Sequence, residues 1–212
     1  MADFFITGTD TEIGKTYVTC ALLRDLCARG LSPIGYKPLA CGDRSDPRAM
    51  RDAVGNSSLS LDLINPIYLR AATAPYIAAE LEQREIRLQD LVDGYHKLAQ
   101  RYSPVLVEGA GGWEAPLAPG LTMADLAAAL GLPIILVVGN KLGAVNHAIM
   151  TAQAIRARGL ECRSIVLNHM GEEWDAASVS NRRLIEEYTH LPVQAELIHG
   201  QEDIDSEAVL GI

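Results

Sequence analysis

The segment Gly8–Thr16, with the sequence GTDTEIGKT, constrains the fold of this chain more than any other feature. An apolar run at Asp3–Thr7 precedes it and predicts a strand, and Gly14–Arg29 follows as a predicted helix that ends at Gly30. A glycine-rich turn that ends in Gly-Lys-Thr at a helix start is typical of a phosphate-binding loop, because backbone N–H groups and the lysine surround phosphate oxygens. The spacing is Gly-x5-Gly-Lys-Thr, one residue longer than the common form. The alternative is a solvated turn with a chance Gly-Lys-Thr, but the flanking strand and helix favour the phosphate loop.

Apolar runs and amphipathic stretches alternate along the rest of the chain. The apolar runs show no polar alternation, which suits strands buried on both faces of a parallel sheet. The pattern predicts an α/β fold, a single P-loop NTPase domain over residues 1–212, with a doubly wound, mostly parallel sheet flanked by helices. The expected later strands are Pro33–Lys37, Pro104–Gly109, Pro133–Gly139, Ser164–Leu167 and Val193–Leu197, and the expected later helices are Asn146–Arg158, Ser178–Thr189 and, in a less regular middle part, the stretches around Ile77–Leu81 and Leu88–Arg101.

Charge and cysteine usage narrow the classes of function. The formal net charge is −9 and the 18 basic residues form no dense run. We therefore expect no binding to nucleic acid or to a membrane, since phosphate surfaces need a basic footprint. The four cysteines lack CxxC spacing, which favours free thiols in a reducing compartment. The first residues lack the pattern of a signal peptide and the longest apolar run is far short of a membrane span, so we expect a cytoplasmic protein.

Three further positions carry side chains that a phosphate-transfer site needs. Lys37 ends the second predicted strand, and a lysine at a buried strand end usually has an anionic partner, although it can also extend to the surface. Glu108 ends an apolar strand before Gly109-Ala110-Gly111-Gly112, the usual place of a magnesium-binding carboxylate. The alternative for Glu108 is a salt bridge at a strand end. Asp46 lies in a predicted loop, where Asp43 and Asp52 compete with it as candidates.

The segment Gly139–Gly143, GNKLG, nearly matches the guanine-reading motif Asn-Lys-x-Asp. Gly143 stands where that motif requires the aspartate. Without a carboxylate to accept from the guanine N–H groups, the sequence does not support guanine selectivity.

The sequence resembles one family, the dethiobiotin synthetases, which are ATP-dependent enzymes of biotin synthesis. The resemblance covers about residues 3 to 170, and the long phosphate loop with KPxxxG and EGAGGW is a specific combination, whereas residues 171–212 match poorly. The matching segments are GTDTEIGKT, GYKPLACG, Asn56–Ser58, NPIYL with TAPYIAAELE, VLVEGAGGWEAPL, Thr122–Ala127, LPIILVVGNKLGAVNHAIMTAQAI and Asn168.

The resemblance implies ring closure on 7,8-diaminononanoate (7,8-diaminopelargonate) with CO₂ or bicarbonate, ATP and Mg²⁺, to give dethiobiotin, ADP and phosphate through a carbamate and a carbamic–phosphoric anhydride. It implies catalytic roles for Lys37 and Lys15 and a homodimer whose substrate site lies at the subunit interface. The implied metal ligands are Thr16, Asp46 and Glu108. The implied nucleotide-binding residues are Glu12, Ile13, Gly14, Lys15, Thr16, Tyr17, Asp46, Glu108, Gly109, Ala110, Gly111, Asn168 and His169, with Asn168 reading adenine, and the implied substrate-binding residues are Thr11, Lys37, Cys41, Leu142, Gly143 and Asn146.

Two positions depart from the family pattern. Cys41 stands where the family commonly has a serine that contacts the diamine, and we expect Lys37 and Lys15 to lower the pKa of its thiol. Ile198-His199-Gly200 replaces the adenine-side Pro-x-Leu of the family, which predicts looser nucleotide discrimination.

Two other functions remain as alternatives. A ParA/MinD-like ATPase switch would bind a protein or DNA, but such proteins place an extra lysine at the start of the phosphate loop, where this chain has Thr7-Gly8-Thr9. A cobyrinate amide synthase-like ligase domain would require a glutamine-hydrolysing partner domain, for which this chain has no room.

Overall fold

The computed structural model describes residues 2–212, so residue 1 of the predicted domain lies outside the described residues. A six-stranded, fully parallel sheet with the strand order β10-β9-β8-β1-β5-β2 forms its centre. This arrangement confirms the predicted α/β class and the parallel sheet. The six strands are β1 (Phe4–Gly8), β2 (Ile34–Tyr36), β5 (Val105–Glu108), β8 (Ile134–Gly139), β9 (Cys162–Asn168) and β10 (Val193–Leu197).

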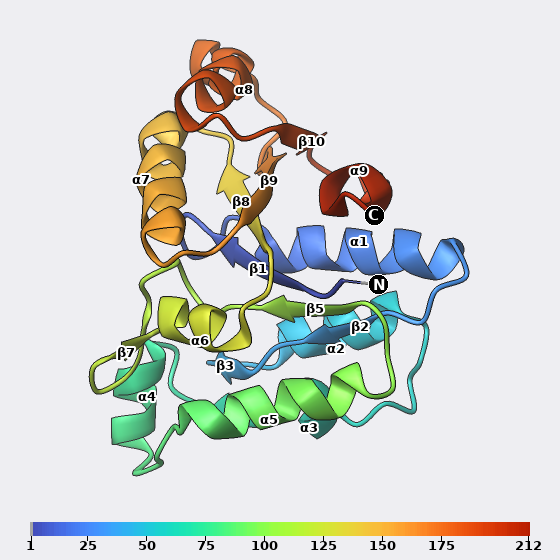
Figure 1. Ribbon diagram of the computed structural model, residues 1–212, viewed down its shortest axis with the longest axis vertical. Helices are drawn as coiled ribbons and strands as arrows, with labels where there is room; N and C mark the ends of the chain where they lie inside the picture. The colour runs from blue at the N-terminus through green and yellow to red at the C-terminus, as the bar shows by residue number, and fades with distance from the viewer. Residues whose placement is uncertain (1) are drawn as a thin grey trace.

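Helices cover both faces of this sheet (Figure 1). Right-handed crossovers place helices on one face or the other according to the direction in which the chain moves across the sheet. One face carries α1 (Lys15–Ala28), α2 (Ser45–Ala53) and α9 (Ser206–Leu210), and α1 contacts both of the others. The other face carries α5 (Leu88–Ala99), α6 (Met123–Leu130), α7 (Ala144–Ala157) and α8 (Ala176–Thr189).

Two small sheets lie outside the central one. Strands β3 and β4 pair in parallel, and β6 and β7 form an antiparallel pair. In Figure 1 the arrows of β1 and β5 point to the side of the molecule on which β3 lies. The remaining elements are β3 (Leu39–Cys41), α3 (Leu61–Ile64), β4 (Ile67–Leu69), α4 (Pro75–Leu81), β6 (Pro116–Ala118) and β7 (Leu121–Thr122).

The core explains why the apolar runs become central strands. Every residue of β1, β5 and β8 is buried, because both faces of the sheet are covered by helices. On α1, Val18, Leu22 and Leu26 recur at helical spacing and are fully buried. The carboxyl ends of the parallel strands therefore form one rigid edge, where polar residues can be held in fixed positions.

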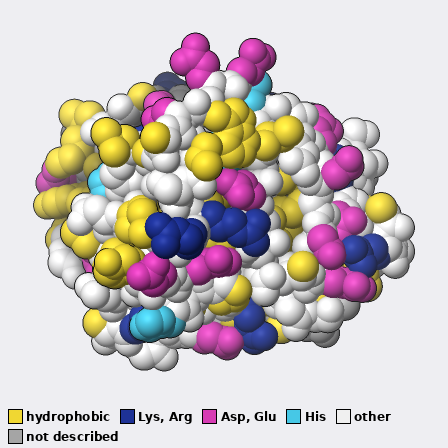
Figure 2. Space-filling view, turned by 90° about the horizontal axis from the view of Figure 1, so that it is seen from above, with side chains coloured by type: hydrophobic (Ala, Val, Ile, Leu, Met, Phe, Trp, Pro, Cys, Tyr) yellow, Lys and Arg dark blue, Asp and Glu magenta, His cyan; other side chains and the backbone are white. Residues whose placement is uncertain are grey.

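The surface seen in Figure 2 carries mixed charge, with Lys and Arg side chains lying beside Asp and Glu side chains. Helix α8 contributes such pairs through Arg182 and Glu186 at 3.8 Å and through Arg183 and Glu187 at 3.7 Å. Within residues 2–212, no helix has the length and apolar character needed to cross a membrane.

Candidate active site

The phosphate loop lies between β1 and α1 and has the backbone that its sequence requires. Gly14 has φ +87°, and a Cβ atom there would lie 2.1 Å from Nδ2 of Asn168. Only glycine tolerates both the left-handed backbone and this close approach. The Asn168 side chain donates a hydrogen bond to the Ile13 carbonyl at 2.9 Å and so links the end of β9 to the loop. Glu12 also has a positive φ, 58°.

Lys15 folds back over this loop. Its Nζ atom donates to the carbonyl of Asp10 at 2.7 Å, and the side chain is 6% exposed. Burial and the nearby charge of Lys37 lower the pKa of Lys15 to about 8. The fraction of Lys15 that carries a charge near pH 8 therefore depends on whether an anionic ligand is bound.

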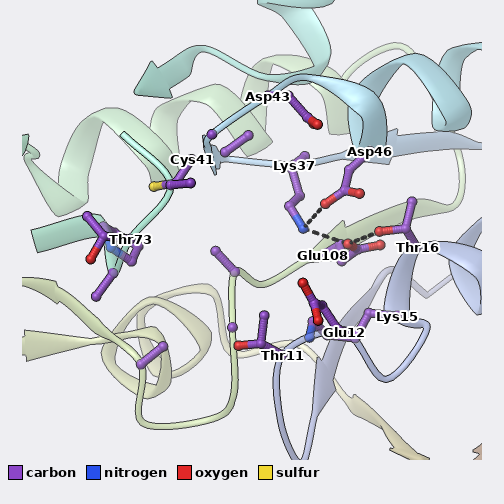
Figure 3. A pocket seen from close by; sticks show the side chains of 18 of the residues that line it. Thr11, Glu12, Lys15, Thr16, Lys37, Cys41, Asp43, Asp46, Thr73 and Glu108 are labelled. Carbon is purple, nitrogen blue, oxygen red and sulfur yellow. Dashed lines mark hydrogen bonds and ion pairs between the residues drawn. The ribbon is translucent and has the colours of Figure 1, made fainter. Parts of the chain in front are cut away.

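Lys37, Asp46 and Glu108 converge at the carboxyl edge of the sheet (Figure 3). The Lys37 Nζ atom lies 2.6 Å from Glu108 Oε1 and 2.8 Å from Asp46 Oδ2. Lys37 follows β2, Glu108 ends β5, and Asp46 lies in the first turn of α2. Burial alone would lower the pKa of Lys37, but the two carboxylates outweigh it and raise that pKa. Lys37 therefore stays charged and fixed in position.

Glu108 connects this cluster to the phosphate loop. Its side chain is fully buried and accepts hydrogen bonds from the hydroxyls of Thr16 and Thr19, each at 2.7 Å. A buried carboxylate with three charged or hydroxyl donors is held in one orientation. The phosphate loop and the Lys37 cluster thus form one connected network.

The oxygen atoms of this network fit a magnesium ion. Mg²⁺ prefers hard oxygen ligands and is usually held by one or two carboxylates together with phosphates and water. Thr16 and Glu108 are in direct contact, and Glu108 and Asp46 face the same ammonium group, so a small cation could engage all three. Across the described residues, His, Cys, Asp and Glu side chains alone form no cluster of three or more that could hold a metal ion. The set here is two carboxylates and a hydroxyl.

A cavity of about 1090 Å³ opens over this network. It extends from the phosphate loop to the loops that follow β3 and β4. Eleven of the residues predicted from the sequence line it, which are Thr11, Glu12, Gly14, Lys15, Thr16, Lys37, Cys41, Asp46, Glu108, Ala110 and Gly111.

Five other predicted nucleotide-binding residues lie around this cavity without lining it. Asn168 and Ile13 are joined by the hydrogen bond described above, which holds the phosphate loop to the end of β9. The Gly109 carbonyl accepts a hydrogen bond from Lys37 Nζ at 3.3 Å. Tyr17 lines a second, smaller cavity between α1 and α2. His169 is buried in a separate cluster, where its Nε2 atom lies 2.8 Å from both Asn140 Nδ2 and Glu196 Oε1.

The predicted residues Leu142, Gly143 and Asn146 are not among those that line the cavity within residues 2–212. Leu142 and Gly143 lie in the turn between β8 and α7, Asn146 lies in the first turn of α7, and Leu142 is 82% exposed. A single chain therefore does not bring these three residues to the Lys37 cluster.

Two details of the sequence analysis are corrected by the structure. Asp46 lies in helix α2 rather than in a loop, and Asp43 instead accepts hydrogen bonds from the Ser45 hydroxyl and N–H. The expectation of a lowered Cys41 pKa is wrong. Burial and, to a lesser degree, the charge of Glu82 raise that pKa to about 11, and the opposing effect of Lys37 is smaller.

We expect Cys41 to react slowly with iodoacetamide at pH 7, because a thiol with a pKa of about 11 is almost entirely protonated. Its labelling rate should rise steeply with pH up to about 11. Mass-spectrometric mapping of the labelled peptide measures this rate. Fast labelling at pH 7 would contradict the burial argument.

Sequence reasoning missed three groups of residues at the site. Thr19 lies about one helical turn after Thr16, so the spacing alone places both hydroxyls on the same face of α1 and could have indicated a shared partner. Asn65 is fully buried and its side chain donates to the Lys37 carbonyl at 2.9 Å, which no local pattern indicated. The segment from Arg70 to Pro75 lines the cavity but lies far from the phosphate loop in the sequence.

A family model and curated proteins match almost the whole length of this chain. A family model described as an AAA domain matches residues 2–204. A protein of Akkermansia muciniphila named ATP-dependent dethiobiotin synthetase BioD is 49% identical over 210 residues, covering 99% of this chain and 98% of its own length. A protein of the same name from Anaeromyxobacter dehalogenans is 44% identical, covering 90% of this chain and 86% of its own length.

Solved structures with similar folds are distant in sequence. A ParA family ATPase from Chlorobium tepidum is 12% identical with a TM-score of 0.56, and the match covers 100% of this chain and 90% of that one. The MinC:MinD complex of Aquifex aeolicus contains a chain that is 14% identical with a TM-score of 0.58, covering 95% of this chain and 83% of that one. At such low identity the likeness establishes the P-loop NTPase fold alone.

Proposed function

The chain belongs to the ATP-dependent dethiobiotin synthetase family, and we propose that it closes a cyclic urea on 7,8-diaminononanoate with CO₂ and ATP. It is an ATP-dependent ligase of biotin biosynthesis. The proposal adds the substrates, the intermediates and the roles of individual residues, with residues 1–212 acting as one ligase domain.

The proposed reaction has three steps. One amine attacks CO₂ and loses a proton, which gives a carbamate. A carbamate oxygen then takes the γ-phosphoryl group of ATP, and ADP leaves. The second amine attacks the carbonyl carbon of the resulting carbamic–phosphoric anhydride, inorganic phosphate leaves, and loss of a proton completes the ring.

Lys37 is assigned the main electrostatic role in these steps. Carbamate formation and phosphoryl transfer both build negative charge, and a fixed buried cation stabilises such charge strongly. Lys37 is 4% exposed and held by two carboxylates and by a carbonyl. Lys15 is assigned the phosphates at the phosphate loop, where the loop N–H groups and the start of α1 also favour an anion.

Thr16, Asp46 and Glu108 are proposed to hold Mg²⁺, which when bound would neutralise charge on the β- and γ-phosphates. Thr19 then positions Glu108 through its 2.7 Å hydrogen bond. Asn168 is proposed to read adenine. The segment Ile198-His199-Gly200 stands where the family has Pro-x-Leu, and Ile198 is 48% exposed. We therefore propose that the protein discriminates less strictly between ATP and other nucleoside triphosphates.

We also propose a homodimer in which Leu142, Gly143 and Asn146 of one chain reach the substrate of its partner. Leu142 is 82% exposed at the turn that follows β8, on the same edge of the sheet as the cavity. An apolar side chain with this exposure favours burial against another surface.

The observation that carries the proposed function is the buried Lys37 between Asp46 and Glu108 above a phosphate loop. The test is whether ATP turnover requires 7,8-diaminononanoate together with bicarbonate. We expect ADP release to depend on both. Release that responds instead to DNA or to a partner protein, as a ParA/MinD-like switch requires, would overturn the proposal.

We expect ATP binding at pH 8.5 to be accompanied by proton uptake. Free Lys15 has a pKa of about 8, so about three quarters of it is neutral at this pH. Bound phosphates raise its pKa, so the protein takes up protons between the free and bound values, and affinity falls as pH rises above about 8. Calorimetric titration in two buffers of different ionisation enthalpy measures the uptake.

Lys15→Arg is the matched control for this titration, because a guanidinium stays charged throughout the range and should show no uptake. Equal uptake in the variant and in the native protein would assign the proton to another group.

A further inference from the structure

Lys37 lies just beyond the ladder of the central sheet. Strand β2 is an edge strand of that sheet, and its pairing with β5 ends at Tyr36 opposite Val107. Lys37 is the next residue, and Figure 3 shows its side chain extended toward Asp46 and Glu108. A functional side chain is positioned only as well as the backbone that carries it. The Lys37 backbone therefore depends on contacts from outside the sheet to stay in place.

The end of α3 and the residue that follows it, Asn65, supply these contacts. The Asn65 side chain is fully buried, and its Nδ2 atom donates to the carbonyls of Lys37 and Ile67, each at 2.9 Å. The Lys37 N–H donates to the carbonyl of Ile64, the last residue of α3, at 2.9 Å. Both polar groups of the Lys37 backbone are therefore held by two consecutive residues.

Arg44 fixes the orientation of the Asn65 carboxamide. Its Nε atom donates to Asn65 Oδ1 at 3.1 Å, and its Nη2 atom donates to the Asn65 carbonyl at 2.8 Å. Because a guanidinium can only donate, the carboxamide oxygen must face Arg44, and both N–H bonds of Nδ2 remain for the two carbonyls. The Arg44 guanidinium is itself held, 2.8 Å from Asp62 Oδ1 and 5.7 Å from the centre of the Tyr68 ring.

The same carboxamide connects Lys37 to the helix that carries Asp46. Arg44 is the residue directly before α2, and Asp46 lies in the first turn of that helix. Asn65 therefore contacts the Lys37 backbone on one side and, through Arg44, the start of α2 on the other. The Lys37 and Asp46 side chains meet at 2.8 Å, so this link fixes the relative position of two groups at the candidate site. A buried carboxamide whose donors are all paired resists displacement, because each lost bond leaves an unpaired polar group.

We propose that Asn65 is a positioning residue, which holds the Lys37 ammonium at the reaction site and at a fixed distance from Asp46. The inference rests on the proposed function, in which Lys37 stabilises the charge that builds up on the carbamate and on the transferring phosphoryl group. Asn65 is not among the residues that line the cavity within residues 2–212, so it acts on the reaction through Lys37. A small displacement of a group that stabilises the transition state lowers the rate strongly.

The test is a double-mutant cycle between Asn65→Asp and Lys37→Ala, with kcat for ADP release as the readout. Aspartate has nearly the same shape and can still accept from Arg44, but it has no N–H group for the Lys37 carbonyl. We expect Asn65→Asp to lower kcat by about 10- to 100-fold when Lys37 is present. In the Lys37→Ala background it should lower kcat by no more than about twofold, because the lysine through which it acts is gone. An equal fractional loss in both backgrounds would overturn the proposal, and so would an unchanged kcat in Asn65→Asp.

Asn56→Asp is the matched control, because it makes the same chemical change at an exposed asparagine. Asn56 Oδ1 accepts from the Ser58 hydroxyl at 2.6 Å and from the Ser58 N–H at 3.2 Å, and a carboxylate can accept both bonds. This variant should leave kcat unchanged. Arg44→Gln is a second variant at a partly buried position, and it should lower kcat by about 3- to 10-fold by releasing the carboxamide oxygen. If Asn65→Asp does not fold, an unchanged kcat in folded Arg44→Gln overturns the proposal.

Acylation of the lysines by a pulse of acetic anhydride separates this inference from the proposed function. The chain has four lysines, of which Lys15 and Lys37 are buried, and mass-spectrometric peptide mapping measures the rate at each. We expect Lys37 to react about tenfold faster in Asn65→Asp than in the native protein, because the two lost hydrogen bonds favour local opening there. The rate at Lys15 should not change.

An unchanged rate at Lys37 would overturn the proposal, and so would an equal rise at Lys15, which would show a general loosening of the protein. Labelling requires no turnover. A protein that forms no cyclic urea would therefore refute the proposed function, while the labelling rates would still decide whether Asn65 holds Lys37 in place.

Discussion

Lys37→Ala should lower kcat by about 10²–10³, the usual cost of losing a group that stabilises charge in a transition state. The lysine is the one charged donor that touches Asp46, Glu108 and the Gly109 carbonyl at once, so no neighbouring cation replaces it within the described residues. Steady-state ADP release with saturating diamine, bicarbonate and ATP measures the effect.

Lys97→Ala is the control for Lys37→Ala, since Lys97 is exposed on α5, away from the cavity. It should leave kcat unchanged. Activity of Lys37→Ala within threefold of the native enzyme, with a normal melting curve, would remove Lys37 from the catalytic machinery.

Glu108→Gln should raise the Mg²⁺ concentration needed for half-maximal activity by at least tenfold and should also lower Tm. The amide has nearly the same shape but loses the charge that binds Lys37 and that would bind the metal ion. Removing one partner of a buried ion pair costs about 3–5 kcal/mol when the other charge is left unpaired. Because Asp46 remains beside Lys37 in this variant, the free energy of unfolding should fall by about 3 kcal/mol or less.

Measuring activity against Mg²⁺ concentration at a temperature well below the Tm of the variant separates the two effects. Glu187→Gln, an exposed change on α8, is the control. An unchanged Mg²⁺ midpoint in a folded Glu108→Gln protein would make Glu108 a structural partner of Lys37 only.

The parts of the fold that were predicted correctly are those with long apolar patterns. The runs at Pro104–Gly109 and Pro133–Gly139 become β5 and β8, because four or more consecutive apolar residues favour a fully buried strand. The short strands β3, β4, β6 and β7 were missed, since two or three residues carry no periodicity. Helix α2 was missed because its sequence, SDPRAMRDA, is mostly polar and only Pro47 and Met50 are buried.

The candidate site was predictable where its residues stand next to a strand end or a glycine-rich turn. Lys37 and Glu108 are such residues, and the sheet order places β5 between β1 and β2, which brings them together. The hydrogen bond from Thr19 to Glu108 joins residues 89 positions apart, so only the folded chain reveals it. The Cys41 pKa was misjudged because sequence spacing identifies nearby lysines but not burial, and burial has the larger effect here.

The most direct test of the account is the identity of the product. The purified protein is incubated with 7,8-diaminononanoate, carbon-13 bicarbonate, ATP and Mg²⁺, and the products are analysed by mass spectrometry. The account predicts a cyclic urea that carries one labelled carbon, formed in equal amount with ADP and phosphate and absent without ATP. ATP hydrolysis with no labelled product would contradict it.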